Sequence, residues 1–171
     1  MTAPLVHRAD TPTHGEERTQ LEAWLDYHRD TLLMKCAGLT DDQLRVRSAE
    51  PSTLSLLGLV RHMAEVERYW FRRQFGGADL GPLYWYTGDD PDHDFNGALT
   101  SDAAADFAAY QEEVLAARST VAGRPLDEQF VSARGVTFDL RWVYIHMIEE
   151  YARHNGHADL LRERIDGTTG D

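Results

Sequence analysis

Apolar residues recur every three or four positions along four stretches of the chain, which is the spacing of amphipathic helices. These stretches cover residues 16–38, 54–75, 103–121 and 137–164. Strict alternation of apolar and polar residues, the mark of half-buried strands, is not convincing anywhere, although residues 129–131 suit a short extended piece. The pattern therefore predicts an all-α fold.

Residues that start and stop helices stand at the ends of these stretches. Thr40 forms a capping box with Gln43, which predicts a short helical turn just after the first helix. Thr137 or Asp139 can cap the start of the fourth helix, and Gly167 supplies its end. These local signals support the helix boundaries that the apolar spacing predicts.

Four helices of about 20 residues each predict a four-helix bundle, an architecture whose core often holds metal sites. Long connections follow the second and third helices, at residues 78–99 and 123–138. We therefore expect a topology other than simple up-down-up-down order. The length of 171 residues fits one domain over residues 1–171, with residues 1–15 as an N-terminal arm.

A polar stripe runs along the fourth helix. At about 100° per residue, His146, Glu150, His154 and His157 fall within an arc of roughly 80°. Burying these groups is costly unless they are paired, hydrogen-bonded or bound to a cation, so a metal ion is a candidate partner. Burial of the whole helix is predicted by the apolar residues spread around it, which are Trp142, Val143, Ile145, Ile148, Leu160 and Leu161.

Spacing alone leaves the ligand pair on this helix open. His146 with Glu150, Glu150 with His154, and His154 with His157 each lie about one turn apart. Pairing of Glu150 with Arg153 would also account for the carboxylate without any metal. The residues by themselves therefore indicate a metal site on this helix without selecting its members.

His62, the only histidine of the second helix, is the best candidate for a ligand from another helix. It lies between Leu59 and Met63, near the predicted buried side. Two imidazoles and one carboxylate leave a coordination position open, which is typical of catalytic zinc rather than structural zinc. His28 on the first helix is not expected to be a ligand.

The composition narrows the class of protein. The chain has 42% apolar residues and 29 acidic against 17 basic residues, a net charge of −12. No Lys/Arg cluster stands out, so we expect no nucleic-acid partner, and no apolar run is long enough to predict a membrane span. The single cysteine, Cys36, fits a reducing cytoplasm and is interpreted as a buried structural thiol.

An acidic segment in the first long connection superficially matches a calcium loop. Asp90, Asp92 and Asp94 have the spacing of the first EF-hand ligands. The required glycine is replaced by Phe95, and Ser101 occupies the twelfth position. We therefore exclude an EF-hand.

Three segments carry a resemblance to a known family. They are residues 32–39 (LLMKCAGL) with 42–44 (DQL), residues 56–71 around His62, and residues 140–159, which run from Leu-Arg-Trp through His-Asn-Gly-His-Ala-Asp. With them the chain resembles the DinB/YfiT-like superfamily over residues 22–164. This resemblance implies a four-helix bundle that carries one divalent ion on three side chains, one from the second helix and two spaced by four on the fourth.

On this resemblance, His62, Glu150 and His154 are the metal ligands. Glu150 stands where many members have histidine, and the resulting set is similar to that of mycothiol-dependent maleylpyruvate isomerase. The ligand count is kept, while the added charge bears on metal preference; zinc is expected first and nickel second. His146 is expected to pack, and His157 either packs or supports a ligand from outside the coordination shell.

The resemblance implies a cytoplasmic enzyme, a metal-dependent thiol S-transferase or isomerase. It would use a low-molecular-weight thiol such as mycothiol or bacillithiol and an electrophilic substrate. The alternative is a non-catalytic, stress-related protein that binds a metal or small ligand, and a third hypothesis is a helical dimerisation module with a vestigial site. A homodimer is expected, with Trp70, Trp85 and Tyr86 as candidate interface residues.

Overall fold

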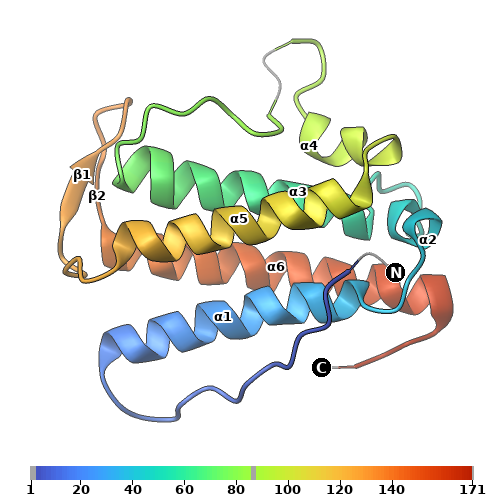
Figure 1. The fold of residues 1–171 in the computed structure, drawn as a ribbon, viewed down its shortest axis with the longest axis horizontal. Coiled ribbons are helices and arrows are strands. Elements are labelled where there is room, and N and C mark those ends of the chain that lie inside the picture. The colour runs from blue at the N-terminus through green and yellow to red at the C-terminus, as the bar shows by residue number, and fades with distance from the viewer. Residues whose placement is uncertain (1–2, 86–87, 171) are drawn as a thin grey trace.

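Four long helices lie side by side in the computed structural model, which describes residues 3–85 and 88–170 (Figure 1). Two short helices and a hairpin cover their ends. This arrangement confirms the predicted all-α bundle, to which the hairpin is added. The elements are α1 (Glu17–Cys36), α2 (Asp41–Arg45), α3 (Leu56–Glu67), π-helix η1 (Arg68–Phe75), α4 (His93–Asn96), 3-10 helix η2 (Gly97–Leu99), α5 (Ala103–Val121), β1 (Gln129–Val131), β2 (Thr137–Asp139) and α6 (Leu140–Asp166).

The order of the helices differs from a simple up-down-up-down bundle, as the long connections predicted. Helix α1 packs along α6, α3 packs along α5, and α3 also contacts α6. Helices α1 and α6 run in one direction, and α3 and α5 run in the other (Figure 1). The two members of each parallel pair are separated by other elements in the chain, because the connection after η1 returns along the bundle before α5 begins.

Local capping chemistry accounts for several helix ends. Thr40 and Gln43 form the predicted capping box at the start of α2. Asp139, rather than Thr137, caps α6 by accepting a hydrogen bond from the backbone N–H of Trp142 at 2.7 Å. Gly167 ends α6 with φ of 77°, a conformation that favours glycine. These boundaries lie where the sequence predicted them.

The second helix departs from the prediction of one continuous helix over residues 54–75. Ser55 caps its start, and its last eight residues form the π-helix η1. The backbone N–H of Gly76 closes this segment with a 2.9 Å hydrogen bond to the Phe71 carbonyl. A π-helical stretch is wider than an α-helix and is frequent at functional sites. Tyr69 and Trp70 lie on this stretch.

The two long connections also contain structure that the apolar pattern did not predict. Helices α4 and η2 lie within residues 78–99. The extended piece predicted at Gln129–Val131 is confirmed as β1, which pairs antiparallel with β2 and places Phe130 opposite Phe138. The second strand was not predicted. The hairpin sits at the end of the bundle where α6 begins (Figure 1).

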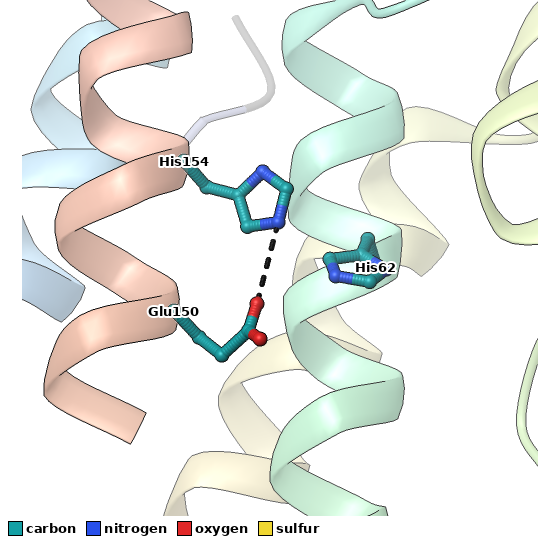
Figure 2. A group of neighbouring side chains, drawn as sticks. All are labelled: His62, Glu150 and His154. Atoms are coloured by element: carbon teal, nitrogen blue, oxygen red, sulfur yellow. Dashed lines mark ion pairs between the residues drawn. The ribbon is translucent and has the colours of Figure 1, made fainter. Parts of the chain in front are cut away.

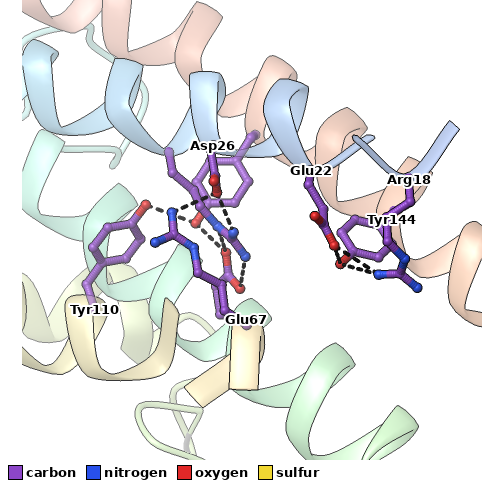
Figure 3. Close-up of polar contacts among 9 residues, drawn as sticks. Arg18, Glu22, Asp26, Glu67, Tyr110 and Tyr144 are labelled. Atoms are coloured by element: carbon purple, nitrogen blue, oxygen red, sulfur yellow. Dashed lines mark hydrogen bonds and ion pairs between the residues drawn. The ribbon is translucent and has the colours of Figure 1, made fainter. Parts of the chain in front are cut away.

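A buried ionic cluster lies in the apolar core between α1, the end of α3, α5 and α6. Arg29 donates two hydrogen bonds to Glu67, at 2.8 and 2.7 Å, and Tyr151 donates to Glu67 at 2.8 Å. The hydroxyl of Tyr151 also lies 3.0 Å from that of Tyr110. Figure 3 shows Glu67 and Tyr110 meeting beside Asp26, while Arg18, Glu22 and Tyr144 form a separate group along the bundle. We call Arg29, Glu67, Tyr110 and Tyr151 the closed cluster, because its charges pair with one another.

The prediction that α6 is buried on all sides is wrong at three residues. Val143 and Leu161 are buried, but Trp142, Ile145 and Leu160 are 39%, 54% and 60% exposed. The helix lies at the edge of a bundle of four, so one side of it faces solvent. Over the described residues, no helix combines the length and apolar character needed to cross a membrane.

Candidate metal centre

Three side chains from two helices converge on one point between α3 and α6. His62 projects from α3 toward Glu150 and His154, which stand one turn apart on α6 (Figure 2). One donor atom from each residue lies within 4.8 Å of the other two. The Nε2 atom of His154 lies 3.5 Å from Oε2 of Glu150, and the rings of His62 and His154 are 4.7 Å apart. We call these three residues the donor cluster.

Asp94 orients His62. Its Oδ2 atom lies 2.7 Å from Nδ1 of His62, and the ring of Phe95 stacks on the imidazole at 4.6 Å. Burial raises the pKa of Asp94, but hydrogen bonds from His62 and Trp85 outweigh it and hold the pKa below its ordinary value. An ionised Asp94 accepts the proton on Nδ1, so Nε2 of His62 keeps its lone pair for a metal.

His154 is also prepared as a ligand. Its Nδ1 atom lies 3.4 Å from Nδ1 of His157, which leaves Nε2 on the side of Glu150. Burial, reinforced by the nearby His62 and His157, lowers the pKa of His154 to about 3. The imidazole is therefore neutral near pH 7, the form that coordinates metals.

His146 packs against aromatic rings, as predicted. It stacks on Trp142 with ring centroids 4.8 Å apart and meets Trp70 edge-on at 4.9 Å. Its Nε2 atom lies 3.8 Å from Oε1 of Glu150, so His146 also forms a His/Glu/Glu group with Glu149 and Glu150. Glu149, the third member of that group, is exposed and already paired with an arginine, Arg153. The His/Glu/Glu group is the weaker candidate for a metal.

An open cavity of about 330 Å³ leads to the donor cluster. His62 and Glu150 lie on it, and Arg134 on the hairpin turn contributes the one cation of its lining among the described residues. The remaining lining is apolar or aromatic and consists of Val66, Tyr69, Trp70 and Trp85. The open coordination side thus faces a space large enough for a small molecule.

Two of the other candidate residues, His28 and Cys36, are not part of the lining of this cavity. His28 contacts Asn155, whose side-chain amide donates to the His28 carbonyl at 3.0 Å. Cys36 is buried among apolar residues, and burial raises its pKa to about 12, which confirms the interpretation as a structural thiol. Trp70 and Trp85 line the cavity, and their role in a dimer interface stays a prediction. Tyr86, the third of that set, lies outside the described residues.

The donor set fits a divalent cation. Two imidazole nitrogens and one carboxylate oxygen suit zinc, and imidazole also suits nickel. The ring nitrogens facing away from the cluster are occupied by Asp94 and His157, the arrangement that metal-binding histidines usually have. Of these two supports, His157 was considered from the sequence, whereas Asp94 was not. Its only signal was a place in the acidic segment excluded as a calcium loop.

Comparison with known protein families gives a match over most of the chain. Residues 20–167 match the family model described as mycothiol S-transferase. This range contains the donor cluster and both supporting residues, and agrees with the resemblance predicted over residues 22–164. No curated protein matches the chain.

Proposed function

Because the chain belongs to the mycothiol S-transferase family, a DinB/YfiT-like family, we propose that it is a metal-dependent thiol S-transferase. The observation that carries the proposal is the convergence of His62, Glu150 and His154 beside an open cavity that His62 and Glu150 line. Family membership supports transfer of a thiol in general. The dependence on a divalent cation, with zinc preferred over nickel, is the part that the donor set adds.

His62, Glu150 and His154 would hold the cation, and their roles follow from their surroundings. Asp94 keeps the proton of His62 on Nδ1, and burial keeps His154 neutral, so both rings offer Nε2. Glu150 brings a negative charge that offsets part of the charge of the ion. When bound, a divalent cation lowers the pKa of a coordinated thiol and so supplies a thiolate near neutral pH.

The cavity would hold the electrophile against this thiol. S-transfer forms a bond between the thiol sulfur and an electrophilic carbon. The S–H bond breaks and its proton leaves, and the bond from that carbon to its leaving group breaks with the electron pair departing on the leaving group, which is chloride for monochlorobimane. Aromatic walls from Tyr69, Trp70 and Trp85 provide apolar contact area and exclude water from the reacting atoms. Placing both reactants in one cavity lowers the entropic cost of their encounter.

Arg134 suggests which electrophiles bind best. No carboxylate among the described residues pairs with its guanidinium, although the protein as a whole is strongly acidic. Mycothiol has no carboxylate of its own, because its cysteine is acylated and joined to a sugar by an amide. We therefore expect Arg134 to favour electrophiles that carry an anionic group.

Location in the cytoplasm and assembly as a homodimer remain predictions.

Metal content and turnover together test the proposal. We expect wild-type protein to carry about one equivalent of transition metal and Glu150→Ala to lose most of it. The zinc-loaded protein, given monochlorobimane with mycothiol, bacillithiol or glutathione, is expected to catalyse conjugation with mycothiol. His154→Ala should abolish this turnover, whereas His28→Ala, a half-buried histidine elsewhere, should retain it.

Two outcomes would contradict the proposal in different ways. Equal and negligible metal in wild type and Glu150→Ala would remove the metal site. Tight metal binding without turnover for any of the three thiols would favour the alternative, a protein that binds a metal or small ligand without catalysis.

A further inference from the structure

Glu65 is a buried carboxylate close to the donor cluster that takes no direct part in it. It follows His62 by three residues on α3 and has no exposed surface. Its Oε2 atom accepts three successive backbone N–H groups, from Leu83 at 2.7 Å, Tyr84 at 2.5 Å and Trp85 at 3.0 Å. Its Oε1 atom accepts no hydrogen bond from any described residue.

A half-satisfied buried carboxylate is expensive for the fold. Burying a charge costs several kcal/mol unless it is paired or fully hydrogen-bonded. An amide or an apolar side chain would fill the same space with less desolvation. One carboxylate oxygen that accepts three successive backbone N–H groups points to a role in holding residues 83–85.

The segment held by Glu65 leads directly to His62. With its backbone N–H fixed by Glu65, Trp85 donates its indole Nε1–H to Oδ2 of Asp94 at 3.0 Å. The same Oδ2 atom contacts Nδ1 of His62 at 2.7 Å. Thus one carboxylate oxygen of Asp94 is positioned by Trp85 and in turn positions the imidazole.

A second anchor of the same segment does not contact the carboxylate oxygen that faces His62. The hydroxyl of Tyr84 donates to Asp106 at 2.9 Å, and the guanidinium of Arg61 lies 3.9 Å from the centre of the Tyr84 ring. Arg61 donates to the backbone carbonyl of Asp94 at 2.8 Å, so this anchor reaches the backbone of Asp94 and not its Oδ2 atom. Tyr84 and Trp85 are therefore neighbours with comparable support but different downstream contacts.

We propose that Glu65 and Trp85 are positioning residues that fix the orientation of His62 through Asp94. They set the affinity and coordination geometry of the metal site. This inference rests on the proposed function, because it requires that a cation binds to the donor cluster. Neither residue supplies a ligand. Their effect is transmitted by the hydrogen bonds that run from Glu65 to Trp85, from Trp85 to Asp94 and from Asp94 to His62.

The test uses Trp85→Phe, which keeps an aromatic ring and removes the indole N–H. Tyr84→Phe is the matched control, since it removes one hydrogen bond from the same segment. Affinity of the metal-free proteins for Zn²⁺ and Co²⁺ is measured by competition with a chromophoric chelator. The visible absorption of the Co²⁺ protein reports coordination geometry.

We expect Trp85→Phe to weaken metal binding about tenfold, the lower end of the effect of partners outside the coordination shell, and to shift the Co²⁺ spectrum. Tyr84→Phe should stay within about twofold of wild type with an unchanged spectrum. Glu65→Gln should resemble Trp85→Phe. Combining the two substitutions should add little, because both act on one path.

Failure of the inference is separable from failure of the proposed function. If wild type binds tightly and Trp85→Phe matches Tyr84→Phe in affinity and spectrum, the positioning role is overturned and the metal site stands. A fully additive double variant would overturn the single path. If wild-type protein binds neither Zn²⁺ nor Co²⁺, the metal site itself is overturned and the inference with it.

Discussion

Glu150 and Tyr151 are adjacent on α6, yet they belong to two polar clusters of opposite character. In the closed cluster, Tyr151 and Arg29 both donate to Glu67 at 2.7–2.8 Å, so the buried charge meets its partners within the protein. In the donor cluster, lone pairs of two imidazoles and a carboxylate face one another, and the contact from His154 to Glu150 is 3.5 Å. The first cluster pairs its charges within the protein, whereas the second brings three metal-ligating side chains together.

This difference distinguishes a cluster that stabilises the fold from a candidate ligand site more clearly than the burial of their side chains does. Both clusters include residues of α3 and α6 and contain groups that are costly to bury. A cluster whose donors and acceptors match supports the fold and needs nothing from solution. A cluster of acceptors on rigid helices, in which neighbouring side chains hold the imidazoles in orientation, indicates a site for an external ligand. The experiments below ask whether the two clusters are independent.

The largest expected effect comes from breaking the closed cluster. Glu67→Gln removes the buried counter-charge of Arg29 and leaves it only the partly exposed Asp26, which should lower the free energy of unfolding by about 3 kcal/mol. Glu113→Gln, which faces two partly exposed arginines, should cost about 1 kcal/mol. Urea unfolding measures both. Metal affinity of the folded protein should be unchanged in each, and a parallel loss in Glu67→Gln would show that the clusters are coupled.

A second experiment uses acid to distinguish the clusters. His154 has a pKa of about 3 when folded but an ordinary value near 6.5 when unfolded. The unfolded chain therefore takes up a proton first as the pH falls, and the metal-free protein should lose stability, roughly 2 kcal/mol by pH 5. The ion pair with Glu67 outweighs burial and raises the pKa of Arg29, and burial raises that of Tyr151, so neither titrates in this range.

The measurement is urea unfolding of metal-free protein between pH 7.5 and 5. His154→Gln should flatten the dependence on pH, because the variant has no imidazole to protonate at that position. His28, whose pKa burial also lowers, provides the comparison, and His28→Gln should flatten it less. Identical slopes in wild type and His154→Gln would contradict the assignment.

The smallest expected effect concerns the mouth of the cavity. Arg134→Gln should raise KM about tenfold for an electrophile that bears a carboxylate, the loss of one charge-assisted contact. KM for a neutral electrophile with the same reactive group should change little. Steady-state kinetics with such a matched pair of substrates measures the effect. Equal changes in KM for both substrates would mean that Arg134 does not recognise the charge of the electrophile.

Most of the fold could be predicted because its signals are local. Thr40, Asp139 and Gly167 act on backbone groups within a few residues, so their effect can be read from the chain. The π-helix at Arg68–Phe75 has no comparable signal, because the same apolar spacing fits an α-helix. The exposed faces of Trp142 and Leu160 depend on which helices pack beside α6, which periodicity does not specify.

The residues of the candidate site likewise divide into those that local spacing could predict and those that depend on the tertiary fold. Glu150 and His154 lie one turn apart on a single helix, so the sequence could suggest them as a pair, and the resemblance to the family selected them together with His62. Asp94 lies 32 positions after His62, and their contact depends on how the connection folds back over α3. No spacing rule connects two residues through such a connection. The carboxylate partner of His62 therefore could be identified only from the structure.

The burial of Cys36 has a consequence for a protein that handles reactive electrophiles. A free thiolate on such a protein would be alkylated by the compounds it processes. The sulfur at position 36 has no accessible surface and stays protonated up to a pH near 12. With no other cysteine in the chain, the protein would offer the electrophiles of the proposed reaction no competing sulfur nucleophile and would be spared self-inactivation.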